Sequence, residues 1–378
     1  MTKTYKTKKA YNKISFKTPY IAVVGGGTGG HIFPAQALAE ALQKKGHQVL
    51  YITDKRGMNF EARPKDIKMF VLDLPRYRFG IMGKIAIGTR TLIEIAYVTL
   101  KFILNRPRLV VGFGGYPSFP PLIAALVLGI PFMLHEQNAY AGRVTRWLAP
   151  LAKKITSVFK NMKGFRLRDQ KKIVVTGNPI RKDIIAVRKS LYKAPTKNIH
   201  LFVVGGSQGA TIFSTSFPKA LGLLPDALKK RLRLTQQCRP KLLKKTEKSY
   251  AKYGIKATLS PFFKNMASEY KKAHLIVTRA GASTVTELAV VGRPSLFIPL
   301  PTAMNDHQMH NARSLSEKGA GWYLLEKDLT PPALAFLLEE ILTDPKKLEK
   351  TAEKLHSLGV TTADQAMTDA VESVLDRQ

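Results

Sequence analysis

The sequence predicts an α/β protein of two Rossmann-like domains whose parallel sheets face each other across an interdomain cleft. Three observations support this prediction. The chain has 378 residues, which is long for one domain. Its composition, with 45% apolar and 9% aromatic residues, is typical of a protein with large cores. An apolar strand, a glycine turn and a helix pattern occur in this order near the N-terminus and again near the middle of the chain.

The first domain begins with PYIAVVGGGTGG at 19–30, a β-branched apolar run that ends in glycines. A helix pattern rich in Ala and Leu follows and ends at Lys45-Gly46-His47, after which QVLYIT at 48–53 supplies the next strand. We therefore expect a right-handed parallel βαβ unit. Further along, the apolar stretch at 119–134 contains three prolines and a glycine, and predicts a buried helix followed by a strand.

The second domain repeats this order in NIHLFVVGGSQGA at 198–210 and again in LIVTRAGASTVT at 275–286. Between the halves lies GNPIR at 177–181, and its Asn-Pro pair is a turn and linker signal. We place the boundary there. The predicted parts are a basic arm at 1–18, a first domain at 19–180 and a second domain at 181–361.

Basic residues are in large excess and are clustered along the chain. There are 61 Lys and Arg against 26 Asp and Glu, a formal charge of +35. No acidic residue precedes Glu40, and none lies between Glu136 and Asp169. This charge exceeds what solubility requires and predicts an anionic partner or surface. The sequence shows no zinc-finger spacing or basic-aromatic motif, so no nucleic-acid partner is expected.

The sequence also indicates a compartment. Its single cysteine, Cys238, cannot form an intramolecular disulfide and suits a reducing environment. The N-terminus lacks the apolar region of a secretory signal. No uninterrupted apolar run reaches the roughly 20 residues that cross a bilayer. We expect a cytoplasmic protein without a membrane span.

The first glycine turn fits a nucleotide-binding pattern. Gly25, Gly27 and Gly30 match G-x-G-x-x-G, in which glycines allow the backbone to approach a diphosphate at a helix N-terminus. Asp54 follows the second strand, where a dinucleotide site places its ribose-binding carboxylate. Taken alone, the pattern leaves a nicotinamide-dependent dehydrogenase and a purely structural turn open as alternatives.

Similar turns in the second half favour a ligand between two facing domains. In GGSQGA, Ser207 can donate its hydroxyl to a phosphate, with a helix N-cap as the alternative role. In RAGASTVTE, small residues permit close approach, and Glu287 lies one helical turn beyond Ser283. A carboxylate there can accept hydrogen bonds from both hydroxyls of a ribose.

Two polar features of the first half are candidates for chemistry. His31 follows the glycine loop at a helix N-terminus, where the helix dipole disfavours protonation and keeps the imidazole available as a base. A structural histidine is the alternative. HEQN at 135–138 follows a predicted strand, and ligands bind at the carboxyl ends of parallel strands.

Seven motifs occur in order along the chain: GGGTGGHIFPAQALA, GFGGYPSFPP, HEQNAYAGRVTRWLA, GNPIR, GGSQGA, RAGASTVTELAVVGRPSLFIPLP and NDHQMHNA. Together they resemble the MurG family over about residues 20–375. The resemblance implies the GT-B fold and an inverting transfer of N-acetylglucosamine from UDP-N-acetylglucosamine to the muramoyl 4-hydroxyl of lipid I, which forms lipid II for peptidoglycan synthesis. A glycolipid-forming UDP-sugar glycosyltransferase of the same fold is the nearest alternative.

The resemblance also assigns roles to residues. His31 is the candidate catalytic base, while Tyr116 and Glu136 lie on the acceptor side. The last helix, 362–378, is implied to pack back on the first domain. No metal or cofactor is expected, because helix N-termini can stabilise the departing UDP. The implied UDP-N-acetylglucosamine site comprises Thr28, Gly29, Gly30, Asn138, Arg181, Ser207, Phe263, Ala282, Ser283, Thr284, Val285, Thr286, Glu287 and Gln308.

The implied acceptor carries a pyrophosphate and a polyprenyl tail, which agrees with the positive charge and predicts a peripheral protein at an anionic membrane surface, on the cytoplasmic face. The segment 81–104 is a candidate contact. On a helix, Arg90, Glu94 and Lys101 share one stripe. The residues that face away from it are Ile81, Ile85, Leu92, Ala96 and Ile103. Such a helix can rest on lipid or pack on its own domain.

Overall fold

The computed structural model describes residues 16, 18–58, 66–75, 81–160, 162–206 and 209–377. The predicted basic arm, apart from Phe16 and Thr18, lies outside the described residues, as does Ser207. The chain divides into two compact units, one formed within 1–180 and 362–378 and the other within 181–361.

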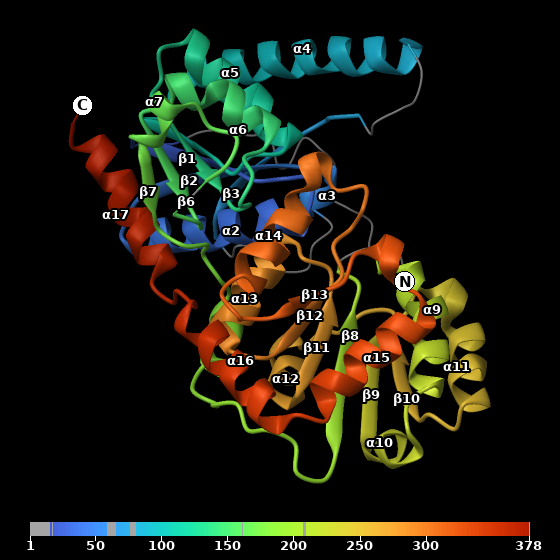
Figure 1. The fold of residues 1–378 in the computed structure, drawn as a ribbon. Helices are drawn as coiled ribbons and strands as arrows, with labels where there is room; N and C mark the ends of the chain where they lie inside the picture. Colours follow the sequence, from blue (N-terminus) through green and yellow to red (C-terminus); the bar gives the residue numbers. More distant parts are fainter. Residues whose placement is uncertain are drawn as a thin grey trace. The chain divides into compact units, whose positions relative to one another are not determined.

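The first unit is built on a parallel sheet of seven strands in the order β3-β2-β1-β4-β5-β6-β7 (Figure 1). Its strands are β1 Tyr20–Val24, β2 Gln48–Asp54, β3 Lys68–Leu72, β4 Leu109–Gly112, β5 Phe132–Glu136, β6 Lys154–Ser157 and β7 Ile173–Val175. Its helices are α2 Gly29–Lys44, α3 Lys55–Met58, α4 Ile81–Leu104, η1 Tyr116–Ser118, α5 Phe119–Val127, α6 Arg143–Leu148, η2 Ala149–Leu151, α7 Leu167–Gln170 and α17 Ala363–Leu375.

Helices cover both faces of this sheet, which is why its central strand is apolar throughout. All five residues of β1 are buried. Tyr20, Ala22 and Val24 pack in a cluster with residues of α4 and α5, whereas Ile21 and Val23 pack in a cluster with residues of α2 and α17. Strand side chains alternate between faces, so a strand buried on both faces needs apolar residues at every position.

The strand order reverses between β1 and β4. Loops after these two strands therefore leave the same edge of the sheet in opposite directions, which creates the crevice where Rossmann-like sheets bind ligands. The predicted glycine turn follows β1, and the GFGGYPS motif follows β4. The HEQN motif ends β5, the next strand in the sheet. Three motifs that are distant in sequence thus share one edge.

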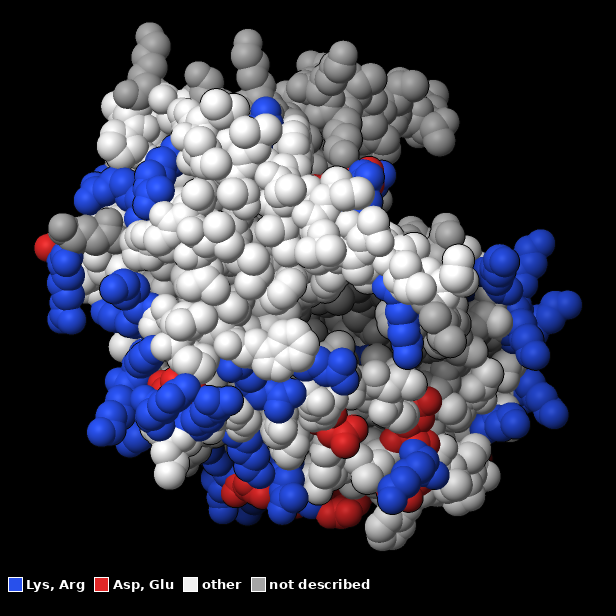
Figure 2. Space-filling view, turned by 90° about the horizontal axis from the view of Figure 1, so that it is seen from above, with Lys and Arg blue, Asp and Glu red and all other residues white. Residues whose placement is uncertain are grey.

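The long helix α4 turns its apolar side away from its own unit. Leu92, Leu100 and Ile103 are each more than half exposed, whereas Glu94 is buried and Arg90 forms an ion pair with Asp73. The face on the α4 and α5 side has a wide uncharged area (Figure 2). The apolar stripe predicted for 81–104 is therefore not the surface that packs on the domain core; α4 instead buries Val98 and Phe102.

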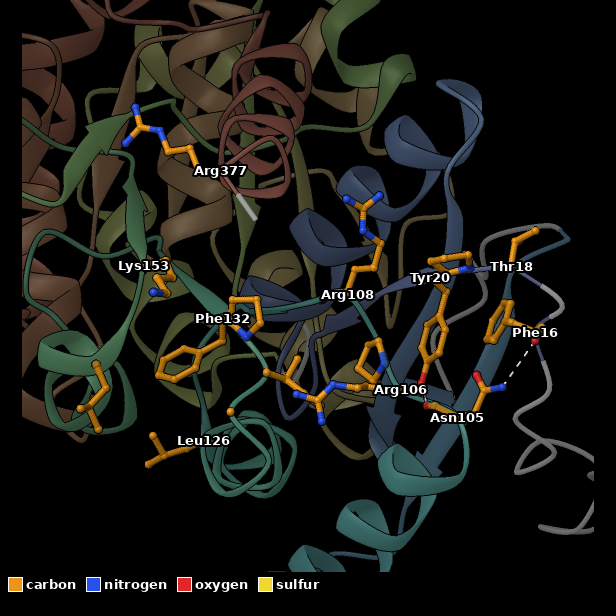
Figure 3. Close-up of a pocket in the computed structure, with 16 residues that line it drawn as sticks. Phe16, Thr18, Tyr20, Asn105, Arg106, Arg108, Leu126, Phe132, Lys153 and Arg377 are labelled. Carbon is orange, nitrogen blue, oxygen red and sulfur yellow. Dashed lines mark hydrogen bonds between the residues drawn. The ribbon is translucent and has the colours of Figure 1, made fainter.

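A shallow hollow lies at the opposite edge of the sheet, at the amino ends of β1, β4 and β5 (Figure 3). Cations and apolar side chains line it, including Tyr20, Arg106, Arg108, Phe132, Lys153 and Arg377. The Tyr20 hydroxyl donates a hydrogen bond to the Asn105 carbonyl, 2.7 Å away. Because the motifs lie at the carboxyl ends of the strands, this hollow is separate from the crevice that they form.

Helix α17 belongs to the first unit although it ends the chain. Its Met367 and Val371 are buried in one cluster with Leu38 and Leu42 of α2. At the surface, Lys45 pairs with Asp369 and Glu372 at 3.1 and 2.9 Å. Apolar burial holds the helix in place, because exposed ion pairs contribute little.

The second unit repeats the architecture with a six-stranded parallel sheet in the order β10-β9-β8-β11-β12-β13. Its strands are β8 Ile199–Val204, β9 Leu232–Gln237, β10 Ala257–Ser260, β11 Leu275–Thr278, β12 Ser295–Phe297 and β13 Trp322–Tyr323. Its helices are α8 Lys182–Val187, α9 Thr211–Gly222, α10 Asp226–Arg231, η3 Pro240–Leu242, α11 Leu243–Lys252, α12 Met266–Lys272, α13 Ala282–Val291, η4 Met304–Asp306, α14 His307–Ser316, η5 Glu326–Asp328, α15 Pro331–Leu342 and α16 Pro345–Ser357.

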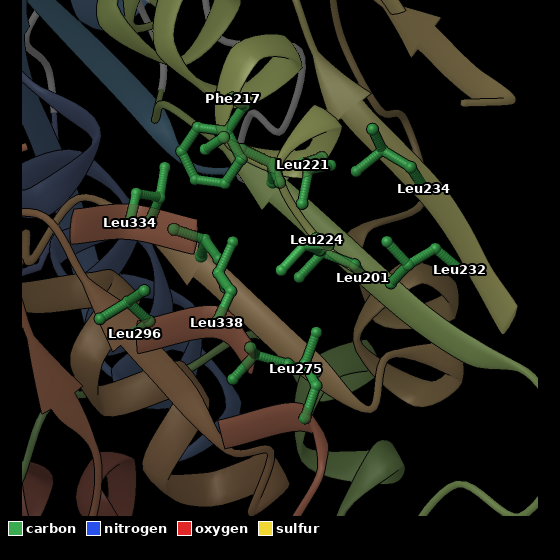
Figure 4. Packing of buried hydrophobic residues seen from close by; sticks show 14 of the residues in the cluster. Leu201, Phe217, Leu221, Leu224, Leu232, Leu234, Leu275, Leu296, Leu334 and Leu338 are labelled. Atoms are coloured by element: carbon green, nitrogen blue, oxygen red, sulfur yellow. The ribbon is translucent and has the colours of Figure 1, made fainter. Parts of the chain in front are cut away.

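Leucines dominate the core of this second sheet (Figure 4). Side chains from the strands meet others from α9 and α15, including Leu201, Phe217, Leu221, Leu275, Leu296, Leu334 and Leu338. The order reverses here between β8 and β11, the two strands that precede the GGSQGA and RAGAST turns. The prediction of two Rossmann-like domains with parallel sheets is confirmed. Among the described helices, none combines the length and apolarity needed to span a bilayer.

We predict that Met367→Ala destabilises the first unit by about 2–5 kcal/mol, because it leaves a cavity in a fully buried cluster. Urea unfolding followed by circular dichroism measures the change. Leu167→Ala, at a position 83% exposed on α7, is the control and should change stability by less than about 0.5 kcal/mol. Equal unfolding midpoints for the two variants would contradict the packing of α17.

Candidate active site

The glycine turn after β1 is built from residues that leave no room for a side chain. A Cβ at Gly25 would lie 2.4 Å from the Ala35 Cβ, and one at Gly26 would lie 2.8 Å from the Pro117 Cβ. Gly27 has φ +85°, which favours glycine. The turn therefore packs directly against the first turns of α2 and against the loop after β4.

Asp54 holds this turn in place. Its Oδ1 accepts hydrogen bonds from the backbone N–H groups of Gly27 and Gly57, both at 3.1 Å, and its Oδ2 accepts one from Arg56 at 2.8 Å. The carboxylate is buried. Asp54 therefore stabilises the loop. Its carboxylate oxygens are bonded to protein groups, which argues against the ribose-binding role that the dehydrogenase alternative requires.

His31 lies in the first turn of α2 and is half-buried against the neighbouring loops. Its Nδ1 is 3.1 Å from Oε1 of Gln137. A Cβ placed on Gly115 would meet the His31 ring at 3.1 Å, so the ring lies directly against the loop after β4. The structure therefore brings the candidate base together with the loops that follow β4 and β5, next to Thr28, Gly29 and Gly30.

Glu136 organises the turn that follows β5. Its Oε1 accepts hydrogen bonds from the backbone and side-chain amides of Asn138, both at 3.1 Å, and its Oε2 accepts one from the Gly142 N–H at 2.9 Å. Glu136 is 2% exposed. Its carboxylate is therefore placed to orient Asn138.

Tyr116 connects the loop after β4 to α4. Its hydroxyl shares a short hydrogen bond with the Thr91 hydroxyl, on a turn of α4 that is buried at this point. Of the two residues predicted on the acceptor side, Tyr116 thus contacts the helix with the exposed apolar side, whereas Glu136 lies within its own turn.

His135 is completely buried one residue before Glu136. Its Nδ1 is 2.9 Å from the Thr156 hydroxyl, and its Nε2 is 3.3 Å from Oδ1 of Asn178 in the GNPIR segment. Burial lowers the pKa of His135 from 6.5 to about 3. The imidazole is therefore neutral near pH 7, and it ties the end of β5 to the last residues of the first unit.

In the second unit, three side chains meet beside α13. The Arg181 guanidinium lies 3.5 Å from Oε1 of Glu287, and the Tyr270 hydroxyl donates to Oε2 at 3.1 Å. Burial raises the pKa of Glu287, while the positive charge of Arg181 and the hydrogen bond from Tyr270 oppose the rise. The structure thus brings together Arg181 and Glu287, two residues of the implied UDP-N-acetylglucosamine site.

The residues in the first turn of α13 differ in their burial. Ala282 and Val285 are buried, whereas Ser283 and Thr284 are half-buried at the helix N-terminus. The Thr286 hydroxyl donates back to the Ala282 carbonyl at 3.0 Å. Ser283, Thr284 and the first backbone amides are consequently the groups of this segment best placed to meet a phosphate.

Two further predicted residues, Gln308 and Phe263, belong to the same unit. Oε1 of Gln308, at the start of α14, accepts a hydrogen bond from the Leu300 N–H at 3.0 Å. Phe263 is half-buried and its ring meets Phe202 edge-on, 5.3 Å between centroids. The turn after β8 is anchored by the Gly205 N–H, which donates to Oε1 of Gln237. Among the described residues, no three His, Cys, Asp or Glu side chains converge as metal ligands.

Comparisons with known proteins show the family to which the chain belongs. The glycosyltransferase family 28 N-terminal domain matches residues 21–157, and the glycosyltransferase family 28 C-terminal domain matches residues 200–372. The chain belongs to glycosyltransferase family 28, among the MurG enzymes. It has the two parallel-sheet, Rossmann-like domains of the GT-B fold.

The similarity to individual members of this family extends over nearly the whole chain. A UDP-N-acetylglucosamine--N-acetylmuramyl-(pentapeptide) pyrophosphoryl-undecaprenol N-acetylglucosamine transferase of Rhodospirillum centenum is 41% identical, with 93% of each chain covered. The enzyme of the same name from Rhodospirillum rubrum is 42% identical over 95% of this chain and 93% of its own. The crystal structure of Acinetobacter baumannii MurG matches with a TM-score of 0.77 and 31% identity, over 94% of this chain and 100% of that one.

Sequence analysis missed several buried polar residues that shape this family 28 site. Arg279 donates from Nη1 to the carbonyls of Ile298 and Pro299 at 3.1 and 3.2 Å, and so joins the loops after β11 and β12. Asn311 donates to the Ala280 carbonyl at 3.1 Å. An arginine at the end of an apolar strand was a usable signal for Arg279. Nothing in the sequence pairs Tyr270 with Glu287 or Gln137 with His31.

We predict that His135→Gln flattens the pH dependence of stability in the first unit. Between about pH 6.5 and 3 the unfolded chain binds a proton at His135 that the folded chain does not, so stability falls as the pH falls. The contribution is up to about 1.4 kcal/mol per pH unit. Urea unfolding at pH 7 and pH 5 measures the slope. Leu148→Ala, a buried apolar control, should lower stability equally at both pH values.

Proposed function

We propose that this chain transfers N-acetylglucosamine from UDP-N-acetylglucosamine to the muramoyl 4-hydroxyl of a polyprenyl-pyrophosphoryl muramoyl-peptide, lipid I, and so forms lipid II for peptidoglycan synthesis. The observation that carries the proposal is the identity of about 40% to enzymes named for this transfer, over nearly the full length of both chains. The proposal is further supported by the positions of four turns: the glycine turn and the GFGGYPS motif follow β1 and β4, and the GGSQGA and RAGAST turns follow β8 and β11, where the strand order of each sheet reverses.

The second unit supplies the donor site in this proposal. The N-terminus of α13, with Ser283 and Thr284, meets the phosphates, and Glu287 accepts hydrogen bonds from ribose hydroxyls while Phe263 meets the uracil. Arg181 lies 3.5 Å from Glu287, so one cation and one carboxylate are available at the nucleotide. Backbone amides at a helix N-terminus stabilise the negative charge that develops on departing UDP, because they are already oriented. Ser207 and Gln308 complete the proposed donor contacts.

The first unit supplies the chemistry at the acceptor. The acceptor oxygen attacks the anomeric carbon as the bond from that carbon to the UDP oxygen breaks, which inverts the configuration from α to β. The hydroxyl proton passes to His31, the base among the residues around the glycine turn. Asn138, oriented by Glu136, contacts the donor sugar. Tyr116 lies on the acceptor side, between this turn and α4.

The acceptor's tail places the proposed reaction at the cytoplasmic surface of the membrane. The exposed apolar side of α4 includes Met82, Ile85, Leu92, Ile93, Leu100, Ile103 and Leu104. This side has a wide uncharged area, and the chain as a whole has a large excess of Lys and Arg (Figure 2). Apolar insertion and attraction to anionic lipid act together in peripheral proteins.

The deciding experiment is UDP release from UDP-N-acetylglucosamine, measured with a lipid I analogue, with diacylglycerol and with no acceptor. The proposal expects UDP release and a disaccharide product only with the lipid I analogue. Release with diacylglycerol alone would instead establish the glycolipid-forming alternative. A lack of release with either acceptor, at a concentration where UDP binds, would refute glycosyl transfer to lipids.

We predict that Glu287→Ala raises the KM for UDP-N-acetylglucosamine by about 30-fold or more, because loss of two charge-assisted hydrogen bonds costs about 2–4 kcal/mol. Initial rates of UDP release measure the change. Tyr270→Phe keeps the carboxylate and removes one contact to it, so its effect should be much smaller. Glu317→Ala, exposed on the second unit, is the control. A wild-type KM in a folded Glu287→Ala variant would exclude this role.

We predict that a Leu92→Ser/Ile103→Ser double variant binds anionic vesicles about tenfold more weakly than the wild type in high salt, because two side chains no longer enter the lipid. Vesicle co-sedimentation at low and high salt measures the change. The matched control is Leu191→Ser/Leu223→Ser, two exposed leucines of the second unit. Equal loss in both double variants, or equal binding of the wild type to neutral and anionic vesicles, would contradict the proposed surface.

A further inference from the structure

The hydrogen bonds around His31 determine which of its ring nitrogens carries the proton. A neutral imidazole has one N–H donor and one nitrogen with a lone pair, and only the second can act as a base. Nδ1 of His31 lies 3.1 Å from Oε1 of Gln137. The orientation of the Gln137 amide therefore decides whether Nδ1 donates or accepts.

A backbone carbonyl sets that orientation. Nε2 of Gln137 donates to the Phe113 carbonyl, 3.0 Å away. The carbonyl can only accept, so the amide nitrogen must face it, and a flipped amide would set two oxygens against each other. Oε1 then faces His31 and accepts a hydrogen bond from Nδ1–H. The hydrogen bonds therefore run in one direction, from His31 Nδ1–H to the Gln137 oxygen and from the Gln137 amide N–H to the Phe113 carbonyl.

Gln137 is held firmly enough to impose this arrangement. It is 1% exposed, directly after β5. The residues on either side are also fixed, since Glu136 binds the Gly142 and Asn138 amides and His135 contacts Thr156. Rotation of this buried amide would break both hydrogen bonds, and each polar group left without a partner would cost about 1–3 kcal/mol.

We propose that Gln137 is a positioning residue that holds His31 in the tautomer with the proton on Nδ1, so that Nε2 carries the lone pair that receives the acceptor's proton. This inference rests on the proposed function for the identity of the acceptor. During transfer the O–H bond of the acceptor breaks and its proton binds Nε2. The resulting imidazolium keeps its Nδ1–H bond to the Gln137 oxygen, which stabilises the positive charge without adding a negative one.

The tautomer can be measured directly. In enzyme labelled with ¹⁵N-histidine, two-bond ¹⁵N–¹H correlation spectra distinguish a nitrogen that carries hydrogen from one with a lone pair, and His31→Ala identifies the His31 signals among the 8 histidines. We expect Nδ1 to carry the hydrogen in the wild type. In Gln137→Met, which is similar in size but cannot form these bonds, we expect a mixture of tautomers. The opposite tautomer in the wild type would overturn the proposal.

Kinetics provide the second measurement. Gln137→Met should lower kcat about 10- to 100-fold, less than the roughly 10²- to 10⁴-fold loss expected for His31→Ala, and should leave the KM for UDP-N-acetylglucosamine unchanged. Gln137→Glu should restore most of kcat, because a protonated carboxyl donates to the Phe113 carbonyl and accepts from Nδ1–H through its other oxygen. Tyr20→Phe removes a hydroxyl that donates to the Asn105 carbonyl at the opposite edge of the sheet, away from the site, and should keep kcat within about twofold.

These outcomes separate the possible failures. Wild-type kcat and an unchanged tautomer in Gln137→Met would refute the positioning role. A loss of kcat in Gln137→Met with an unchanged tautomer and reduced stability would show a structural role only, and would also refute it. The spectra need no acceptor, so the expected tautomer in an enzyme that fails to use lipid I would disprove the proposed function and leave the hydrogen-bond chain intact.

Discussion

The close packing of the turn after β1 is the constraint on which the first site depends. Gly25 and Gly26 lie so near to Ala35 and Pro117 that no side chain fits, and the buried Asp54 carboxylate holds the backbone amide of Gly27. Because this turn starts α2, it also determines where the helix begins and hence where His31 lies. A glycine pattern that is shared with dinucleotide sites serves here to bring an imidazole against a second loop.

Buried polar groups at the end of β5 also hold the first site in a fixed arrangement. His135, Glu136 and Gln137 are consecutive and almost wholly buried, and each forms hydrogen bonds with a different part of the unit. Leaving any of them without partners would cost about 1–3 kcal/mol. One short segment thereby fixes the linker residue Asn178, the turn that carries Asn138, and the His31 ring. The site is stiff because its polar groups are satisfied by protein atoms.

The same unit combines this fixed edge with an exposed apolar surface on α4. Helix α4 uses Val98 and Phe102 to pack on its domain and leaves a second apolar side exposed. The amphipathic pattern of 81–104 was compatible with lipid contact and with core packing. The structure excludes core packing for the stripe that holds Leu92 and Ile103, because both side chains are exposed, and contact of this stripe with lipid stays a proposal. In the second unit, by comparison, the leucines in Figure 4 are enclosed by α9 and α15.

Local patterns in the sequence were sufficient to predict both Rossmann-like domains, since buried strands, glycine turns and helix starts depend on residues close together in the chain. They also indicated His31, the HEQN segment and the N-terminus of α13. Pairings between distant residues required the tertiary structure: Asp54 with the glycine turn, Gln137 with His31, and Tyr270 with Glu287. These contacts join residues 17 to 106 positions apart. The order of strands in the sheet brings the first two pairs within hydrogen-bonding distance, and the packing of α12 against α13 does so for the third. No local periodicity encodes either arrangement.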